Sequence, residues 1–242
     1  MDAGKFTGLA RSVIQDIYSR GKLPILVGGT GLYLRALVYG LAPIPDIPQE
    51  MHDRIMNECK KHGPEALYRR LQAEDPETAD RLHPRDRQRI TRALEVKAGT
   101  GRRLSWWIRK YPCDTPRYTC LRLGLWADLD ELTPRLEARI EQMMAQGAMQ
   151  EIERAWDGCP EESAPGWSGI GCWELLHVLL GRWSWPEARQ AWLKNTRAYA
   201  KRQLTWFKKG PDIHWLGHTD GNLVSSFWFQ ERVNRLLRGE PG

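Results

Sequence analysis

Residues 24–41 read PILVGGTGLYLRALVYGL, and this stretch decides the fold class. The apolar run at 25–27 predicts a short buried strand, the turn at 28–31 needs unhindered backbone, and leucines at helical spacing predict a helix after it. In open α/β sheets, ligands bind beyond the carboxyl ends of the strands, where a helix that opens from a glycine turn offers free N–H groups. The stretch therefore predicts a ligand site, with Thr30 as the only side chain of the turn. An ordinary tight connection between strand and helix is the alternative.

The composition indicates a soluble globular chain with a basic balance. Its 242 residues are 41% hydrophobic and 27% charged, enough for one core or for a core with an inserted subdomain. Lys and Arg number 36 against 30 Asp and Glu, and the net charge of +6 suits a polyanionic partner, although a solvated basic face gives the same balance. Five cysteines without a CxxC pair predict reduced thiols in a cytoplasm, and we expect no metal site built from them. No apolar run reaches the ~18 residues of a membrane span, so no membrane partner is expected.

Prolines separate a core from an insertion. Residues 1–20 show the apolar spacing of a helix, and APIPD at 42–46 ends the helix that follows the glycine turn. From 48 to about 117 the pattern is helical and highly charged, and TCLRLGLW at 119–126 predicts a strand that returns to the core. The expected parts are a parallel-sheet α/β core over 1–45 and 118–220, a helical insertion over 46–117 and a C-terminal tail over 221–242.

The densest basic part of the insertion is HPRDRQRITRALEV at 83–96. It predicts a helix that begins near Asp86 and places Arg89 and Arg92 on one face, next to Gln88. Arginine forks bind phosphate oxygens and glutamine pairs with base edges, so this face suits RNA. A solvated surface helix is the alternative.

A second basic segment, RRLSWWIRK at 102–110, interleaves four cations with two tryptophans. This composition suits a segment that follows an RNA backbone and stacks on bases. It equally suits tryptophans that pack on a neighbouring helix.

The second half of the chain contains further cations at helical spacing. Residues 129–156 predict a long amphipathic helix with a break near Gly147, on which Arg135 and Arg139 lie one turn apart. These two arginines either point at a pyrophosphate or pair with neighbouring glutamates. NTRAYAKRQLTWFKK at 195–209 contains five Lys and Arg on a predicted helix and favours an anionic partner, with a solvated basic helix as the alternative.

Three more segments complete the pattern. SGIGCWELL at 168–176 places two glycines before a helix, where another backbone could approach closely. IHWL at 213–216 predicts a last edge strand, and 227–237 predicts a short helix in the tail.

Four of these motifs, LVGGTGLYLRALVYGL, HPRDRQRITRALEV, SGIGCWELL and TRAYAKRQLTWFKK, together resemble the tRNA dimethylallyltransferases, the tRNA isopentenyltransferase family. The resemblance implies a P-loop-type, nucleotide-binding and ATP-binding α/β core, incomplete at its N-terminus, with a helical insertion that binds the anticodon stem-loop. It also implies transfer of a dimethylallyl group from dimethylallyl diphosphate to N6 of the adenosine 3′-adjacent to the anticodon. Magnesium on the diphosphate, a cytoplasmic location and a monomer are expected with it.

The resemblance further implies which residues contact the substrates. Expected tRNA contacts are Thr30, His52, Gln88, Arg89, Ile90, Thr91, Arg92, Ser168, Gly169, Ile170, Gly171, Cys172 and Trp173. Candidates for the diphosphate or the RNA backbone are Arg135, Arg139, Arg197, Lys201 and Arg202.

The sequence departs from the family pattern in four places, one of which is His52, at a position that resembles a family arginine contact. Gly171, Cys172 and Trp173 stand where the family usually has Gly-Tyr-Lys/Arg. The family's GxxxxGK[ST] loop and the Asp that acts as general base do not occur, so no catalytic residue is assigned. A helix that enters a strand without preceding strands leads us to expect a true start upstream, because a parallel sheet cannot be one strand wide. A non-catalytic RNA-binding remnant and an unrelated nucleotide kinase-like P-loop protein are the alternatives.

Overall fold

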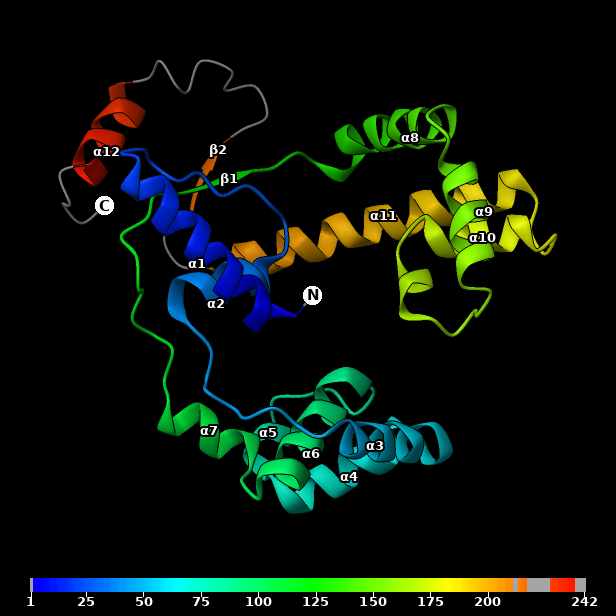
Figure 1. The fold of residues 1–242 in the computed structure, drawn as a ribbon, viewed down its shortest axis with the longest axis horizontal. Coiled ribbons are helices and arrows are strands. Elements are labelled where there is room, and N and C mark those ends of the chain that lie inside the picture. Colours follow the sequence, from blue (N-terminus) through cyan, green and yellow to red (C-terminus); the bar gives the residue numbers. More distant parts are fainter. Residues whose placement is uncertain (1, 211–212, 217–226, 238–242) are drawn as a thin grey trace. The chain divides into compact units, whose positions relative to one another are not determined.

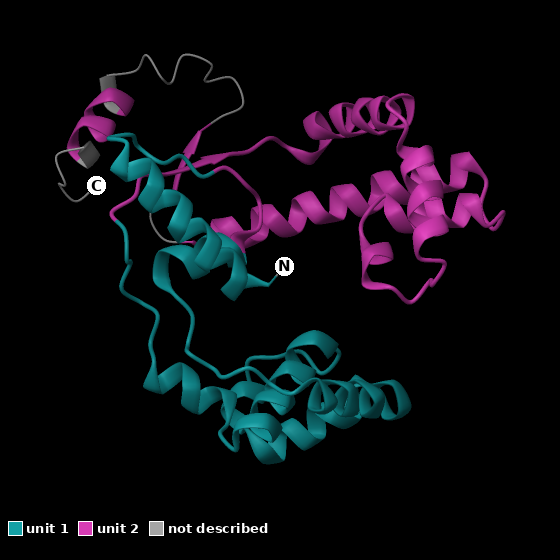
Figure 2. Cartoon of the chain, in the orientation of Figure 1, with its two compact units in different colours: residues 1–26, 32–118 teal, residues 27–31, 119–242 magenta. Residues whose placement is uncertain are grey.

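The computed structural model describes residues 2–210, 213–216 and 227–237. The chain forms two compact units (Figure 2). Residues 1–26 and 32–118 form the first unit, and residues 27–31 and 119–242 form the second. The expected four-part division stays a prediction, although the chain passes from one unit to the other at residue 118, where the insertion was expected to end.

The first unit opens with two helices, α1 (Ala3–Ser19) and α2 (Gly31–Tyr39) (Figure 1). Asp2 caps α1 by accepting a hydrogen bond from the N–H of Lys5, at 2.8 Å. The rings of Phe6 and Tyr33 stack with centroids 4.9 Å apart and join the two helices. The helix predicted over 1–20 is confirmed, because α1 spans most of this range.

Further helices make up most of the rest of the first unit, as expected for the insertion. Leucine and isoleucine side chains from several of them form one core, in which Ile55, Leu67, Leu71 and Leu94 are at most 1% exposed. Burying each such side chain contributes about 1.5–3 kcal/mol to folding. The helices are α3 (Gln49–His62), α4 (Pro64–Glu74), α5 (Pro76–Ala79), α6 (Arg87–Thr100) and α7 (Leu104–Lys110).

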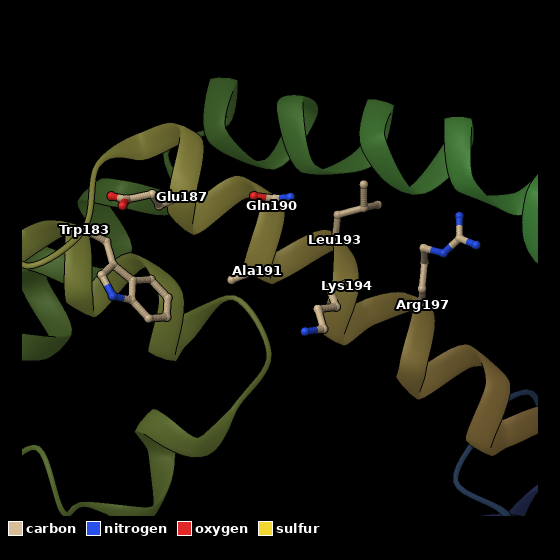
Figure 3. Close-up of a pocket in the computed structure, with 7 residues that line it drawn as sticks. All are labelled: Trp183, Glu187, Gln190, Ala191, Leu193, Lys194 and Arg197. Atoms are coloured by element: carbon tan, nitrogen blue, oxygen red, sulfur yellow. The ribbon is translucent and has the colours of Figure 1, made fainter.

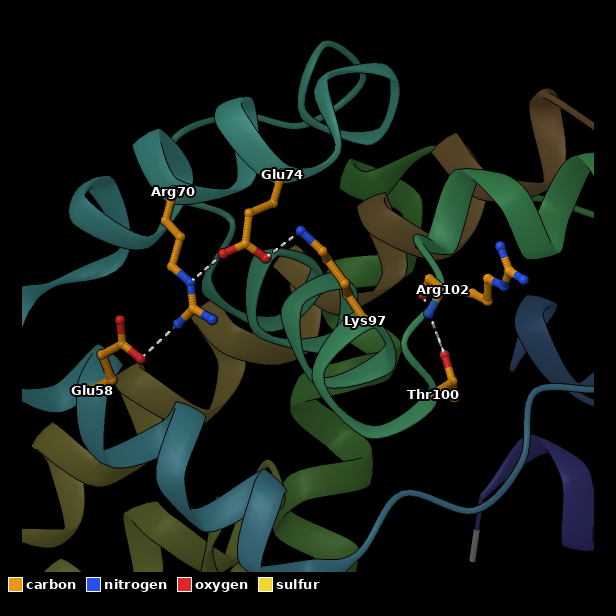
Figure 4. Close-up of polar contacts among 6 residues, drawn as sticks. All are labelled: Glu58, Arg70, Glu74, Lys97, Thr100 and Arg102. Carbon is orange, nitrogen blue, oxygen red and sulfur yellow. Dashed lines mark hydrogen bonds and ion pairs between the residues drawn. The ribbon is translucent and has the colours of Figure 1, made fainter.

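A chain of ion pairs joins α3, α4 and α6 (Figure 4). Arg70 contacts Glu58 at 2.8 Å and Glu74 at 2.7 Å, and Glu74 in turn contacts Lys97 at 3.0 Å. Burial disfavours the charged form of Glu74, but hydrogen bonds from Arg70 and Lys97 outweigh it and lower the pKa of Glu74. The insertion thus neutralises these two cations internally.

The second unit contains a parallel pair of strands, β1 (Arg122–Leu125) and β2 (Ile213–Leu216). Arg122 pairs with Ile213 and Leu125 with Leu216. Both strands were expected, and their parallel pairing confirms the parallel α/β class. Between them the chain forms α8 (Leu129–Ala145), α9 (Ala148–Gly158), η1 (Pro165–Ser168), α10 (Cys172–Leu179) and α11 (Trp185–Lys208); α12 (Phe227–Leu237) follows β2.

A second core lies among α8 to α11 and includes Ile140, Trp167, Leu176 and Trp192. The break predicted near Gly147 is confirmed, because this glycine has a φ of +99° and separates α8 from α9. All five cysteines are free. Within the described residues, no helix has the length and apolarity needed to cross a bilayer.

One expected element is wrong. Residues 25–27 form no strand, and Ile25 and Val27 are 80% and 93% exposed. A strand requires a neighbour that satisfies its N–H and C=O groups. Within the described residues the only strand pairing is that of β1 with β2, so the apolar run stays irregular.

Candidate nucleic-acid interface

The glycine turn at 28–31 packs against the C-terminal half of α11. The Gln203 side-chain amide donates a hydrogen bond to the carbonyl oxygen of Gly29, at 3.2 Å. A Cβ atom built on Gly29 would lie 2.0 Å from Nε2 of Gln203, and one on Gly31 would lie 2.0 Å from Nε1 of Trp206. At Gly31 the rigid indole of Trp206 occupies the space where a Cβ would stand, whereas at Gly29 this space is occupied by the far end of the flexible Gln203 side chain, which can move aside.

Thr30 lies between these two glycines with its side chain exposed. The turn therefore presents one hydroxyl to solvent while its backbone is held on the helix. At Gly28, by contrast, a Cβ atom would have no other atom within 4 Å, so the neighbours leave room for a side chain. The element that approaches this turn closely is therefore α11, and the sequence around the turn does not identify it as the partner.

The basic residues of α11 differ in their surroundings. Lys201 and Arg202 are exposed, with the guanidinium of Arg202 5.8 Å from the ring centroid of Tyr199. Arg197 is half-buried and donates to Thr133 Oγ1, and its guanidinium lies 3.4 Å from Asp130. Arg197 thus joins α11 to the N-terminal part of α8, whereas Lys201 and Arg202 are open to an anion.

The other two cation candidates, Arg135 and Arg139, lie on α8, which packs against α11. Both side chains are exposed. The same helix also carries four acidic residues, Asp130, Glu131, Glu137 and Glu141. α8 as a whole is therefore not basic, and only the exposure of the two arginines favours contact with an anion.

An open groove of about 710 Å³ runs along α11 toward Arg197 (Figure 3). Trp183 lies at one end and Arg197 at the other, with Lys194 between them. From Arg197 to Gln203, which holds the glycine turn, α11 advances six residues or about 9 Å. The remaining lining residues are Glu187, Gln190, Ala191 and Leu193.

The segment at 168–173 is fixed to α11 through a buried carboxylate. Glu174, 1% exposed, accepts hydrogen bonds from the N–H of Gly171 and from Nδ2 of Asn195, both at 2.7 Å. Gly171 has a φ of +93°, and a Cβ there would lie 2.7 Å from the ring of Trp192. Only glycine fits this backbone, because it needs both positive φ and close approach to the indole.

The side chains of this segment have unequal access to solvent. Ser168, Ile170 and Trp173 are exposed, whereas Gly171 is buried and Cys172 is half-buried. Burial raises the pKa of the Cys172 thiol, and the nearby Glu174 carboxylate adds to the effect. Trp173 is the exposed aromatic side chain of this segment, and its ring packs against the ring of His177 with centroids 4.3 Å apart.

In the first unit, the helix that begins at Asp86 presents Gln88, Arg89 and Arg92 to solvent. The side chains of Ile90 and Thr91 are 0% and 4% exposed. Of the five consecutive residues expected at the RNA, the structure therefore directs only three side chains outward.

Glu95 brings two of the expected contact residues together. Its carboxylate, on a residue that is 4% exposed, lies 2.9 Å from Nδ1 of His52 and 3.7 Å from Nη1 of Arg92. His52 comes from α3 and Arg92 from α6, so one buried acid fixes side chains from two helices on the same surface.

Motif reasoning does not assign the roles of Glu95, Glu174, Gln203 and Trp206. The two glutamates nevertheless carry a sequence signal, because each interrupts an apolar run, in ALEV at 93–96 and CWELL at 172–176. A charged residue on the buried stripe of a helix is expected to have polar partners. Gln203 and Trp206 carry no comparable signal, because their partner turn lies more than 170 residues away.

The fold is of the mixed α/β class, and a glycine turn held on a basic helix, together with an arginine face in a helical unit, is typical of a protein that binds nucleic acid. The sequence model of the family described as IPP transferase matches residues 1–210, and the chain belongs to this family. The expected family is thus confirmed.

Two curated relatives carry the name tRNA dimethylallyltransferase. The one from Oleidesulfovibrio alaskensis is 52% identical over 242 residues, which cover 100% of this chain and 77% of the relative. The one from Maridesulfovibrio salexigens is 51% identical over 227 residues, covering 94% of this chain and 74% of the relative.

Solved structures agree with this assignment. The full-length tRNA isopentenylpyrophosphate transferase of Bacillus halodurans is 29% identical with a TM-score of 0.64, over 98% of this chain and 74% of that chain. A eukaryotic dimethylallyltransferase described as acting on tRNA is 28% identical with a TM-score of 0.78, over 100% of this chain and 63% of that chain. The fold class expected from the sequence is therefore that of known tRNA prenyltransferases.

Proposed function

We propose that this chain transfers a dimethylallyl group from dimethylallyl diphosphate to N6 of the adenosine 3′-adjacent to the anticodon in tRNA. The observation that carries the proposal is the glycine turn, which exposes Thr30 while Gln203 and Trp206 hold its backbone on the basic helix α11. Membership of the IPP transferase family and the names of the relatives support the reaction class.

The reaction requires that the negative charge of the departing diphosphate is stabilised and that the proton of the adenine amine is accepted. As the adenine amine attacks the first carbon of the dimethylallyl group, the carbon–oxygen bond breaks, diphosphate leaves with the bonding electron pair, and the amine proton passes to a base. We propose that Lys201 and Arg202 of α11, with Arg135, Arg139 and Arg197, stabilise the negative charge of the diphosphate or of the RNA backbone. We propose that Thr30 contacts the target adenosine, and we assign no residue of this sequence as the general base.

The second part of the proposal concerns the binding of RNA. We propose that the insertion at 46–117 binds the anticodon loop, through His52 and through the exposed side chains Gln88, Arg89 and Arg92. The arginines suit phosphate oxygens and glutamine suits a base edge. Residues 168–173 are proposed as a further tRNA contact, with Trp173 in place of the family's usual cation.

Magnesium is proposed to arrive with the diphosphate. Within the described part of the chain, no group of three or more His, Cys, Asp or Glu side chains is arranged to hold a metal ion. Diphosphate oxygens are themselves suitable ligands for magnesium, so we assign it no protein ligand and derive no step from it. A cytoplasmic location and a monomeric state are also proposed, and light scattering of the purified chain would check the latter.

The decisive experiment combines the purified chain with anticodon stem-loop RNA, dimethylallyl diphosphate and magnesium. We expect the RNA to gain the mass of one dimethylallyl group, and a control RNA with guanosine in place of the target adenosine to gain none. RNA binding without any transfer would contradict the proposed reaction and would favour a non-catalytic RNA-binding protein.

A further inference from the structure

A further positively charged surface, to which none of the contact residues proposed above belongs, lies around α7 in the segment 102–110. We define the α7 surface as Arg102, Arg103, Trp106 and Lys110, whose three cations are exposed. We propose that the α7 surface is an additional phosphate-binding site that contacts the backbone of the tRNA. This inference rests on the proposed function, because it assigns a further contact with the same substrate.

One tryptophan orders two of these cations. The guanidinium carbon of Arg102 lies 5.2 Å from the ring centroid of Trp106, and Nζ of Lys110 lies 4.6 Å from it. The attraction between a cation and an aromatic face holds both charges near this ring. Trp106 is therefore better suited to position cations than to stack on a base.

The second tryptophan of the segment is committed to packing. Nε1 of Trp107 donates a hydrogen bond to Oγ1 of Thr100, at 3.2 Å, and its ring stacks with Tyr111 at 5.8 Å between centroids. Of the two interpretations that the sequence left open for 102–110, base stacking thus loses support and phosphate contact remains.

Buried polar groups hold α7 in place. Asp75, 1% exposed, accepts a hydrogen bond from the N–H of Ser105 at 3.1 Å, which ties the first turn of α7 to the α4–α5 junction. The N–H of Arg102 donates to Oγ1 of Thr100 at 3.2 Å, as Figure 4 shows. Cations on a rigid support bind a ligand with less loss of conformational entropy than cations on a mobile loop.

The three cations of the α7 surface lie close together in the chain and are not neutralised by acidic side chains of the described residues, whereas several other cations of this unit are. Arg70 and Lys97 pair with glutamates, and Arg109 of α7 lies 3.4 Å from Glu77. For Arg102, Arg103 and Lys110 no ion pair is found among the residues that the structure describes. Three uncompensated charges on one short helix and its first flanking residues favour a polyanion, and the polyanion that the proposed reaction supplies is tRNA.

The test removes two charges at the α7 surface and, as a matched control, two exposed charges elsewhere in the same unit. Arg102→Ala/Lys110→Ala is compared with Lys60→Ala/Lys61→Ala at the end of α3, using full-length tRNA in filter-binding titrations over a range of salt concentrations. The α7 variant should bind about tenfold more weakly at low salt. Its slope of log K against log salt should fall by about 1.4 to 1.8, at about 0.7 to 0.9 per lost phosphate contact.

Two further observations complete the design. Arg102→Lys/Lys110→Arg keeps both charges and should retain the salt slope, and circular dichroism should show that all variants are folded. Equal losses in the α7 variant and the α3 control would overturn the inference in favour of a general charge effect. Unchanged tRNA binding in the α7 variant, beside a wild type that binds and transfers, would overturn it and leave the proposed function standing. A wild type that binds no tRNA would instead contradict the proposed function.

Discussion

The side-chain amide of Gln203 donates a hydrogen bond to the carbonyl oxygen of Gly29, and this 3.2 Å contact joins the glycine turn to the basic helix. Trp206, one helical turn further along α11, occupies the space beside Gly31. The turn is therefore shaped by the helix on which it rests, and the exposed hydroxyl of Thr30 is placed by residues that do not themselves need to touch a substrate.

The first prediction concerns the space at Gly31. Gly31→Ala should lower the free energy of unfolding by about 1–3 kcal/mol, because its Cβ would lie 2.0 Å from the indole of Trp206 and the packing must shift. Urea unfolding measures the loss. Gly28→Ala is the matched control, since no atom lies within 4 Å of its Cβ, and similar losses in both variants would contradict the packing argument.

The second prediction concerns the hydroxyl of Thr30. Thr30→Val keeps the shape of the side chain but removes the hydroxyl, so turnover should fall about tenfold, equivalent to about 1.4 kcal/mol, while tRNA affinity stays unchanged. Thr30→Ser retains the hydroxyl and should keep most of the activity. Steady-state prenyl transfer and tRNA binding are measured on the same samples. Equal loss of turnover and affinity would indicate a packing role.

The third prediction concerns the arginine face of α6. Arg89→Ala should weaken tRNA binding and lower the salt slope by about 1, because one phosphate contact is lost. Its stability should change little, since Arg89 is exposed and its pair with Asp86 is a surface ion pair. Arg69→Ala removes an exposed cation from α4 and serves as the control. Identical salt slopes for the two variants would exclude Arg89 from the interface.

The fourth prediction concerns the buried carboxylate of Glu174, which accepts one hydrogen bond on each oxygen. Glu174→Gln offers only one acceptor for the two donors of Gly171 and Asn195, so it should cost about 1–3 kcal/mol of stability. Glu174→Gln/Asn195→Asp restores a donor and an acceptor at the second contact and should recover part of the loss. Thermal unfolding of Glu174→Gln, Asn195→Asp and the double variant measures this coupling, and purely additive losses would show that the paired hydrogen bonds do not cause it.

The fifth prediction concerns pH. Burial disfavours the Asp75 carboxylate, but hydrogen bonds from Ser105 and Thr78 outweigh it, so the pKa of Asp75 is lowered. Its stabilising contribution is therefore fully present above the unfolded-state pKa of about 3.9 and is lost as the pH falls through the folded-state value. Asp75→Asn should be less stable than wild type at pH 7, by about 1–2 kcal/mol, and the difference should shrink in strong acid. A difference that is constant with pH would contradict this account.

Local patterns predict the helices of this chain well. The helix expected over 227–237 is α12 (Phe227–Leu237), and Asp86 caps α6 as its sequence suggests. A cap, a breaker and an apolar stripe act over a few residues, so the sequence alone reveals them. The strand predicted at 25–27 is absent for the opposite reason, because a strand forms only beside a neighbouring strand, and that neighbour can lie anywhere in the chain.

For the candidate site, the sequence motifs identify the segments involved but not the buried residues that hold these segments in place. The run at 88–92 was expected as one contact segment, yet Ile90 and Thr91 are buried and only their neighbours face solvent. Helix geometry explains the difference, because consecutive residues point in different directions around the axis. The acids that orient the exposed side chains, Glu95 and Glu174, become assignable only when their partners are known.

The sequence by itself determined the family and the helices, and it identified the cations that we propose for RNA and diphosphate. The tertiary structure decided which of these residues act together: Gln203 with Gly29, Glu95 with His52, and Asp75 with the start of α7. These pairs are separated by 30 to 174 residues in the chain. Their contacts depend on packing and loop closure rather than on local periodicity, so only the folded chain brings them together.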